Sequence, residues 1–162
     1  MNKYFYILSL TLLMISCGKE VETFEPTTTL KTLLKNGKLN KAYYELRTKH
    51  LFLESRLDTV ESFKTFVKET KIEELVSLTE CEQPIVRCFA FKALAEKDYR
   101  NIREILLHHE SDVEIIQVHD RCIQWNIPVR EYMLRQLEPF AKVKYRFRRK
   151  EYEEVQKEFS KN

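Results

Sequence analysis

Side chains of the types that bind zinc or act as nucleophiles gather in the second half of the chain. They are His108, His109, His119, Asp120 and Cys122. Adjacent side chains on a helix diverge by about 100°, so one helix is not expected to direct both His108 and His109 at one ion. No His-x-x-x-His or Cys-x-x-Cys spacing occurs. We therefore expect no metal site, and we expect His109, which lies on an apolar stripe, to be a core histidine.

The same residues give little support for a catalytic centre. His119 and Cys122 would supply an imidazole and a thiol, but no third group that orients the imidazole is identifiable. Gly18 and Gly37 are the only glycines, and neither begins a glycine-rich turn that binds phosphate. The sequence therefore predicts a protein without catalytic residues.

Residues 141–162 form a C-terminal tail in which a basic cluster precedes several glutamates. Val143, Tyr145 and Phe147 alternate with the basic residues, which are Lys142, Lys144, Arg146, Arg148, Arg149 and Lys150. Such a cluster has the residue types that contact anionic lipid headgroups or an acidic partner. Because the glutamates balance its charge, a solvated flank is the simpler interpretation. The net charge of +3 is too small to indicate nucleic-acid binding.

The stretch Pro84–Leu94, with the sequence PIVRCFAFKAL, predicts a central helix. Proline is tolerated at the first helical position, where its missing N–H has no partner to lose. The helix would be apolar on nearly every side, and such a helix is buried by neighbours on several sides. We therefore expect a mainly all-α fold in which other helices cover this one.

An internal repeat surrounds this helix. The apolar stripe of residues 72–79 recurs thirty residues later at 102–109, and the match continues to Ile116 before it fails at Asp120. A period near thirty residues with two helices per unit is what an α-solenoid requires.

The central helix also carries a recognisable string of residues. Its pattern resembles the second helix of HEAT-type repeats and is formed by Pro84, Val86, Arg87, Ala90, Ala93 and Leu94. The resemblance implies a HEAT-like α-α hairpin solenoid fragment within a helical domain of residues 30–140, with one complete unit at about 70–97 and a degenerate second one. It further implies that Arg87 is structural and pairs with Glu82, Asp112 or Asp120.

The stretch Val113–Trp125 departs from the helical pattern. It is rich in β-branched and aromatic residues, so two short strands around His119–Arg121 are as well supported as a second helix. Asn126 and Pro128 then predict the start of another helix, which Pro139 ends.

The N-terminal residues 1–16 have the form of a signal peptide. Lys3 precedes an apolar run to Ile15 that is too short to span a bilayer of about 30 Å. The residues Met14 to Gly18, with cysteine at position 17, resemble a bacterial lipobox. The resemblance implies export, a diacylglycerol and an acyl chain such as palmitate on Cys17, and a lipidated tether over residues 17–29. Gly18 in place of aspartate favours the outer membrane over the inner membrane.

Three further thiols would then stand in an oxidising compartment. Cys81 and Cys122 are the best candidates for a disulfide, and Cys88 is expected to be a buried free thiol on the central helix. Because the number of thiols is odd, at least one stays free.

Together these features predict a lipoprotein of the bacterial cell envelope. We expect a membrane-anchored helical-repeat module that binds a protein partner or has a structural role, with no cofactor beyond the lipid on Cys17. No nucleic acid or small-molecule substrate is indicated. The alternative is a small exported metal-binding protein or hydrolase that uses the His119–Cys122 stretch.

Overall fold

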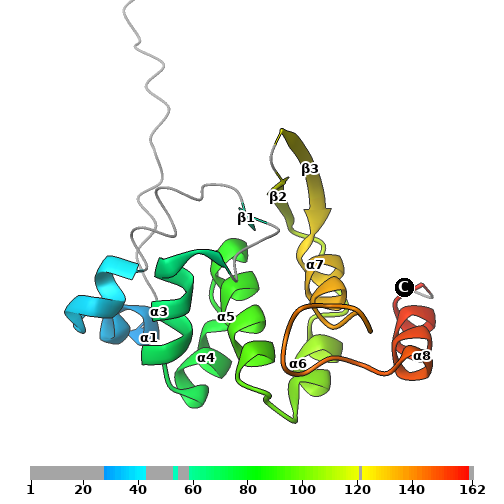
Figure 1. Cartoon of the computed structure of the whole chain (residues 1–162), viewed down its shortest axis with the longest axis horizontal. Coiled ribbons are helices and arrows are strands. Elements are labelled where there is room, and N and C mark those ends of the chain that lie inside the picture. The colour runs from blue at the N-terminus through cyan, green and yellow to red at the C-terminus, as the bar shows by residue number, and fades with distance from the viewer. Residues whose placement is uncertain (1–27, 43–52, 55–58, 121, 161–162) are drawn as a thin grey trace, which may run out of the picture.

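The computed structural model describes residues 28–42, 53–54, 59–120 and 122–160, and Figure 1 shows their arrangement. The helices are α1 (Thr28–Leu33), α3 (Glu61–Glu69), α4 (Ile72–Leu78), α5 (Pro84–Glu96), α6 (Ile102–His108), α7 (Val129–Gln136) and α8 (Arg149–Phe159), with further helical turns at 37–42. The strands are β1 (Leu53–Glu54), β2 (Ile115–Asp120) and β3 (Ile123–Pro128). The fold is therefore mainly helical, as expected. The predicted signal peptide, Cys17 and most of the predicted tether lie outside the described residues.

Helix α5 lies at the centre of the domain, which confirms the expectation for this stretch. Every residue from Val86 to Ala95 is buried. Helices α3, α4, α6 and α7 all contact it. Ala90, Ala93 and Ala95 are completely buried, and their small side chains allow the neighbouring helices to approach closely. On α7, Gln136 accepts a hydrogen bond of 3.1 Å from the buried Lys92 ammonium.

The internal repeat is only partly reflected in the backbone. Helices α4 and α5 are consecutive and pack against each other, but α6 is followed by strand β2 instead of a second helix. Ile115 and Ile116, which match Ile85 and Val86 in the sequence, lie in that strand. The prediction of a second helical unit is therefore wrong here, because β-branched residues favour extended backbone over helix.

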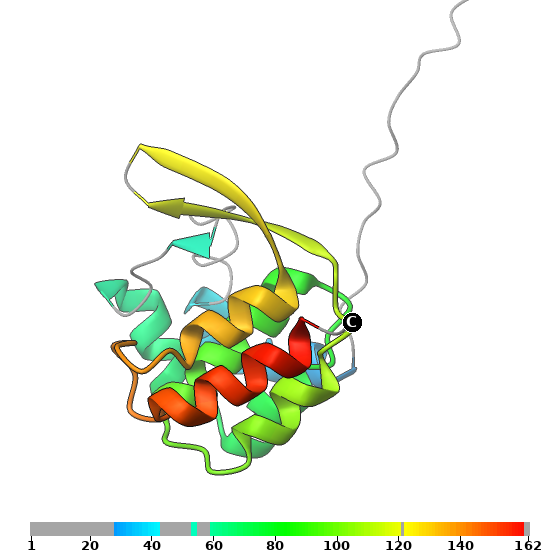
Figure 2. The ribbon, with the colours of Figure 1, turned by 90° about the vertical axis from the view of Figure 1, so that its right-hand side faces the viewer.

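Strands β2 and β3 form an antiparallel hairpin, which settles the ambiguous stretch in favour of strands. Its register pairs Ile115 with Pro128 at the base and Asp120 with Ile123 at the tip. The short strand β1 pairs with β2 in parallel, giving the sheet order β1-β2-β3. The hairpin projects away from the helices, as Figures 1 and 2 show. Asn126, expected at the start of a helix, lies in β3, and α7 begins only at Val129.

The C-terminal segment packs against the helical domain. Val143, Phe147, Val155 and Phe159 are buried within the same core cluster as α5. Two backbone hydrogen bonds of 3.0 Å join this segment to the rest of the domain. The Tyr145 amide donates to the Ala95 carbonyl, and the Phe147 amide donates to the Leu137 carbonyl. The alternating pattern of the tail therefore places apolar side chains inward, while its six basic side chains are exposed. Helix α8 runs across the face shown in Figure 2.

Among the described residues, no helix has the length and apolar character needed to cross a membrane.

Candidate functional site

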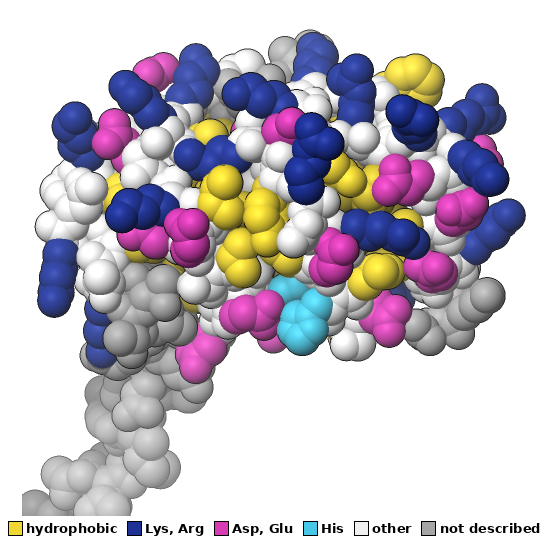
Figure 3. Space-filling model, turned by 90° about the horizontal axis from the view of Figure 1, so that it is seen from below, with side chains coloured by type: hydrophobic (Ala, Val, Ile, Leu, Met, Phe, Trp, Pro, Cys, Tyr) yellow, Lys and Arg dark blue, Asp and Glu magenta, His cyan; other side chains and the backbone are white. Residues whose placement is uncertain are grey.

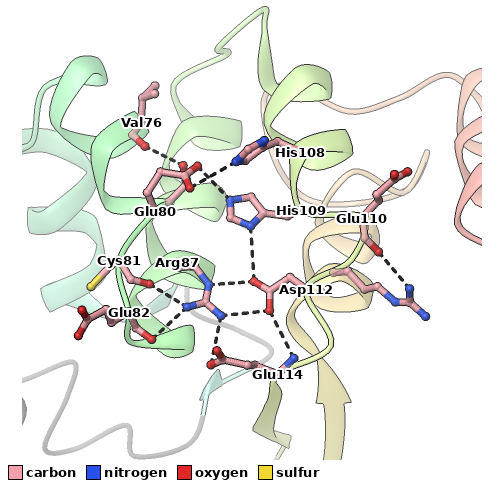
Figure 4. Close-up of polar contacts among 12 residues, drawn as sticks. Val76, Glu80, Cys81, Glu82, Arg87, His108, His109, Glu110, Asp112 and Glu114 are labelled. Carbon is pink, nitrogen blue, oxygen red and sulfur yellow. Dashed lines mark hydrogen bonds and ion pairs between the residues drawn. The ribbon is translucent and has the colours of Figure 1, made fainter. Parts of the chain in front are cut away.

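The candidate site is a hollow of about 550 Å³ between the α4–α5 loop, the end of α6 and the segment that leads into β2. Figure 4 shows the polar contacts along it. Its lining consists of Glu80, Cys81, Glu82, Arg87, His108, His109, Ser111, Asp112, Val113 and Glu114. The view from below in Figure 3 shows exposed histidine bordered by acidic side chains.

Arg87 ties one wall of the hollow together. Its Nε and Nη2 atoms donate to the two carboxylate oxygens of Asp112 at 2.9 and 3.1 Å, a two-point geometry that an arginine fork and a carboxylate share. Nη1 donates to the backbone carbonyls of Cys81 and Glu82 at 2.8 and 3.0 Å. Among the three expected partners, Asp112 therefore forms the ion pair, and Glu82 takes part through its backbone.

The environment of Arg87 keeps its charge fixed. The Arg87 and Asp112 side chains are only 8% and 11% exposed, and a Glu114 oxygen lies 3.3 Å from Nη2. Burial by itself would lower the pKa of Arg87, but the hydrogen bonds and charges of Asp112 and Glu114 outweigh it and raise that pKa. This arrangement leaves the guanidinium occupied by its neighbours and supports a structural role for it.

His109 faces a carboxylate on each side of its ring. Nδ1 lies 3.5 Å from an Asp112 oxygen, and Nε2 lies 3.4 Å from a Glu80 oxygen. The side chain is 8% exposed, as expected of a core histidine, but its buried Nε2 has no hydrogen-bond partner. Burial lowers the pKa of His109, while the charges of Glu80 and Asp112 oppose that shift.

His108 approaches the same carboxylate as His109. Its Nε2 atom lies 3.5 Å from the second Glu80 oxygen. The two neighbouring imidazoles therefore converge on one group, contrary to the divergence expected from a regular helix. The reason is that α6 ends at His108, and the His109 backbone has left helical geometry with φ −92° and ψ 16°. Glu80 was not among the site residues predicted from the sequence.

The other predicted chemical residues lie elsewhere. His119 and Asp120 are in β2, and Cys122 is exposed at the tip of the hairpin, so the structure does not bring all five candidates together. Across the part of the chain that the structure describes, no group of three or more histidine, cysteine, aspartate or glutamate residues is arranged to hold a metal ion. In the structure Cys81, Cys88 and Cys122 are free thiols. The candidate disulfide between Cys81 and Cys122 is not formed.

The hairpin carries a second candidate surface. Among the described residues, the exposed large hydrophobic side chains are Ile72, Val113, Ile115, Ile123 and Phe140. Three of them lie in the hairpin or just before it, with Val113, Ile115 and Ile123 exposed by 59%, 58% and 66%. Because Ile115 is paired at the base of the hairpin and Ile123 at its tip, on opposite faces of the two strands, the candidate surface is centred on Ile123 at the tip.

Comparison with protein-family models, with curated proteins and with solved structures found no match to this chain. The resemblance of the α4–α5 pair to a HEAT-type unit, and that of the N-terminus to a lipobox, therefore stay predictions.

Proposed function

We propose that this chain is an exported, lipid-anchored helical module of the bacterial cell envelope that binds a partner protein through its projecting β-hairpin. The α4–α5 pair would be a single HEAT-like unit of the helical part. In this proposal the helical domain is a rigid support, and Cys17 attaches it to the membrane, with the outer membrane favoured.

The proposed membrane localisation rests on the N-terminal sequence. An apolar run followed by Ser16 and Cys17 resembles a lipobox, although Met14 stands where leucine is usual. Two or more acyl chains anchor a protein stably, because each buried methylene contributes about 0.8 kcal/mol. The polar residues that follow Cys17 would separate the domain from the membrane surface.

The observation that carries the binding proposal is the exposure of Val113, Ile115 and Ile123 on and beside one projecting hairpin. Their exposed apolar surface would be removed from water by a partner, which favours association by about 25 cal/mol per Å². Ile115 lies at the base of the hairpin and Ile123 at its tip, so these side chains would meet a partner as separate contacts and not as one continuous patch.

Strand β3 adds a backbone surface to these side chains. In the sheet of the described residues, β3 stands at the end of the order β1-β2-β3 and has a strand on one side only. The outer edge of such a strand presents N–H and C=O groups that can pair with an extended segment of another protein. Main-chain pairing would supply affinity, and contacts with Ile123 would supply specificity.

A photo-crosslinking experiment tests this proposal with two matched positions. A photoreactive residue replaces either Gln124, which is exposed on β3, or Gln156, which is exposed on α8. We expect irradiation of cells to give a discrete protein adduct from position 124 but not from position 156. The adduct should disappear when Ile123→Ser is added. Adducts of equal yield from both positions, or an adduct that is insensitive to Ile123→Ser, would contradict the proposal.

A further inference from the structure

Phe140 projects into solvent from the connection between α7 and α8. Its side chain is 93% exposed, more than any other large hydrophobic side chain in the described part of the chain. The connection turns sharply here, because Pro139 precedes Phe140 and the Ala141 amide donates a 2.9 Å hydrogen bond to the Glu138 carbonyl. A turn closed in this way presents the aromatic ring at a defined position on the surface.

The segment that follows this turn is fixed to the core and directs its cations outward. Val143 and Phe147 are buried, and the residues that alternate with them are exposed. These exposed residues are Lys142, Lys144 and Arg146. Because burial of the apolar residues sets the direction of the basic ones, the positive charges stand on the same short segment as Phe140.

The glutamates of the C-terminal segment balance only its later cations. On α8, Arg149 pairs with Glu153 and Lys150 pairs with Glu154. The three earlier cations form no ion pair with any carboxylate among the described residues. The interpretation as a self-balanced, solvated flank therefore fits α8 but not the residues that directly follow Phe140.

A hollow of about 460 Å³ extends this basic surface to α3 and the end of α5. Phe63 and Val67 give it apolar walls. Its charged lining consists of Lys64, Lys68, Glu96, Lys97 and Lys144. Lys64 also contacts Glu61, at an exposed position. Four ammonium groups against one carboxylate in the lining attract anions to this side of the domain.

One aromatic side chain beside several lysines matches the headgroup layer of a membrane better than a protein interface. Residues that dominate protein interfaces lie within a ring of further contacts that exclude water. The other exposed large hydrophobic residues that the structure describes are instead at the start of α4 and in or just before the hairpin. At a membrane surface, an aromatic ring enters the boundary of the acyl chains while neighbouring lysines contact anionic headgroups.

We propose that the α7–α8 connection docks on an anionic lipid membrane, with Phe140 inserted and with Lys142 and Lys144 on the lipid phosphates. Four residues separate Phe140 from Lys144, a span of at most about 14 Å, so one shallow contact includes both. This inference rests on the proposed lipid anchor, which holds the domain at the bilayer. Thr28 follows Cys17 by eleven residues, which reach up to about 36 Å and allow this orientation.

This docking leaves the hairpin accessible to a partner. Figures 1 and 2 show the connection between α7 and α8 at the opposite end of α7 from the hairpin. A membrane contact at Phe140 and a protein contact at Ile123 therefore use different sides of the domain.

Tryptophan fluorescence of the full-length chain tests the docking. The chain is extracted from membranes and reconstituted into vesicles of phosphatidylcholine and phosphatidylglycerol with brominated acyl chains, which quench tryptophan that enters the bilayer. Trp125→Phe removes the single native tryptophan. In that background, Phe140→Trp reports on the connection, and Ile123→Trp is the matched control at the exposed hairpin tip. We expect strong quenching at position 140 and little at position 123.

The electrostatic part of the docking is tested in the same vesicles. Lys142→Gln should lower the ratio of inserted to free Phe140→Trp about fivefold, the factor that one lysine contributes near an anionic surface. Lys35→Gln removes the same charge from an exposed position beyond α1 and should leave the ratio unchanged. Vesicles of brominated phosphatidylcholine alone should quench position 140 less than the anionic vesicles do.

Equal quenching at positions 140 and 123 would overturn the docking and favour a protein partner at Phe140. Equal effects of Lys142→Gln and Lys35→Gln would overturn the role of the adjacent lysines. Flotation of the vesicles separates these outcomes from a failure of the anchor, because a chain that does not float with them refutes the proposed membrane attachment, and the docking with it. Far-UV circular dichroism of each variant establishes that the fold is kept.

Discussion

Arg87 and Asp112 form a two-point ion pair that joins the central helix α5 to the segment leading into β2. Their two contacts measure 2.9 and 3.1 Å, and both side chains are almost entirely buried. The same guanidinium holds the backbone carbonyls of Cys81 and Glu82. One side chain therefore fixes the α4–α5 loop, the start of α5 and the base of the hairpin relative to one another.

Loss of this guanidinium should destabilise the fold strongly. Arg87→Ala leaves the Asp112 carboxylate buried without its partner, and we expect the free energy of unfolding to fall by about 3–5 kcal/mol in urea denaturation. Arg135→Ala is a suitable control, because Arg135 pairs with Glu131 at an exposed position on α7. Its effect should stay within about 1 kcal/mol. An Arg87→Ala variant as stable as this control would show that the buried pair does not hold the loop.

The stability of the protein should depend on pH through His109. Burial lowers the pKa of His109 below its ordinary value of 6.5, so the unfolded chain takes up the proton before the folded chain does. The contribution of neutral His109 to the free energy of unfolding is therefore fully present above pH 6.5. It decreases as the pH falls through the folded-state pKa of His109. We expect urea midpoints to fall over this window and His109→Gln to reduce the change. An unchanged profile in His109→Gln would contradict the assignment.

The three thiols of the folded domain should differ sharply in reactivity. Burial raises the pKa of both Cys81 and Cys88, which keeps these thiols protonated, whereas Cys122 is exposed at the hairpin tip. In a Cys17→Ser background, we expect a disulfide reagent to modify the Cys122 thiol rapidly. The thiols of Cys81 and Cys88 should react only after denaturation. Cys122→Ser should abolish the rapid phase. Absence of any rapid phase in the chain that keeps Cys122 would instead favour the disulfide between Cys81 and Cys122.

Contact of the exposed basic residues of the C-terminal segment with anionic membranes is the alternative to a solvated flank, and it makes its own prediction for vesicle binding. Deleting the segment is a poor test, because Val143 and Phe147 belong to the core. Replacing Lys142, Lys144 and Arg146 by glutamine leaves those residues in place and should weaken binding to anionic vesicles by about 1 kcal/mol per charge at low salt. The control replaces three exposed N-terminal lysines: Lys35, Lys38 and Lys41. Equal losses in both triple variants, or none in either, would contradict a specific role for the segment.

Much of the helical architecture could be predicted from residue patterns. The stretch that became α5 is apolar on nearly every side, and only burial by several neighbours accommodates such a helix. The match between Val86 and Ile116 was misleading, because two stretches with the same apolar spacing can adopt different backbones. At Ile115 and Ile116, β-branched side chains and pairing with β3 favour a strand.

The candidate site was harder to predict, because it depends on where a helix ends. The sequence shows two adjacent histidines that could do chemistry, but not the direction of their side chains. They converge on Glu80 because the backbone of His109 no longer follows the helical geometry of α6. Glu80 lies in a different loop, and a single sequence contains no signal of that proximity. Arg87 was predictable as a buried cation in need of a carboxylate, although the choice of Asp112 among the candidates required the fold.

The most direct test of the central claim is metabolic labelling of the full-length chain with radioactive palmitate in wild-type, Cys17→Ser and Cys122→Ser forms. We expect the wild-type chain and Cys122→Ser to carry the label in the membrane fraction, and Cys17→Ser to carry none, because the acyl chains depend on the thiol of residue 17. A label that persists in Cys17→Ser, or a wild-type chain that remains unlabelled with its first residues uncleaved, would contradict the account of a lipid-anchored module.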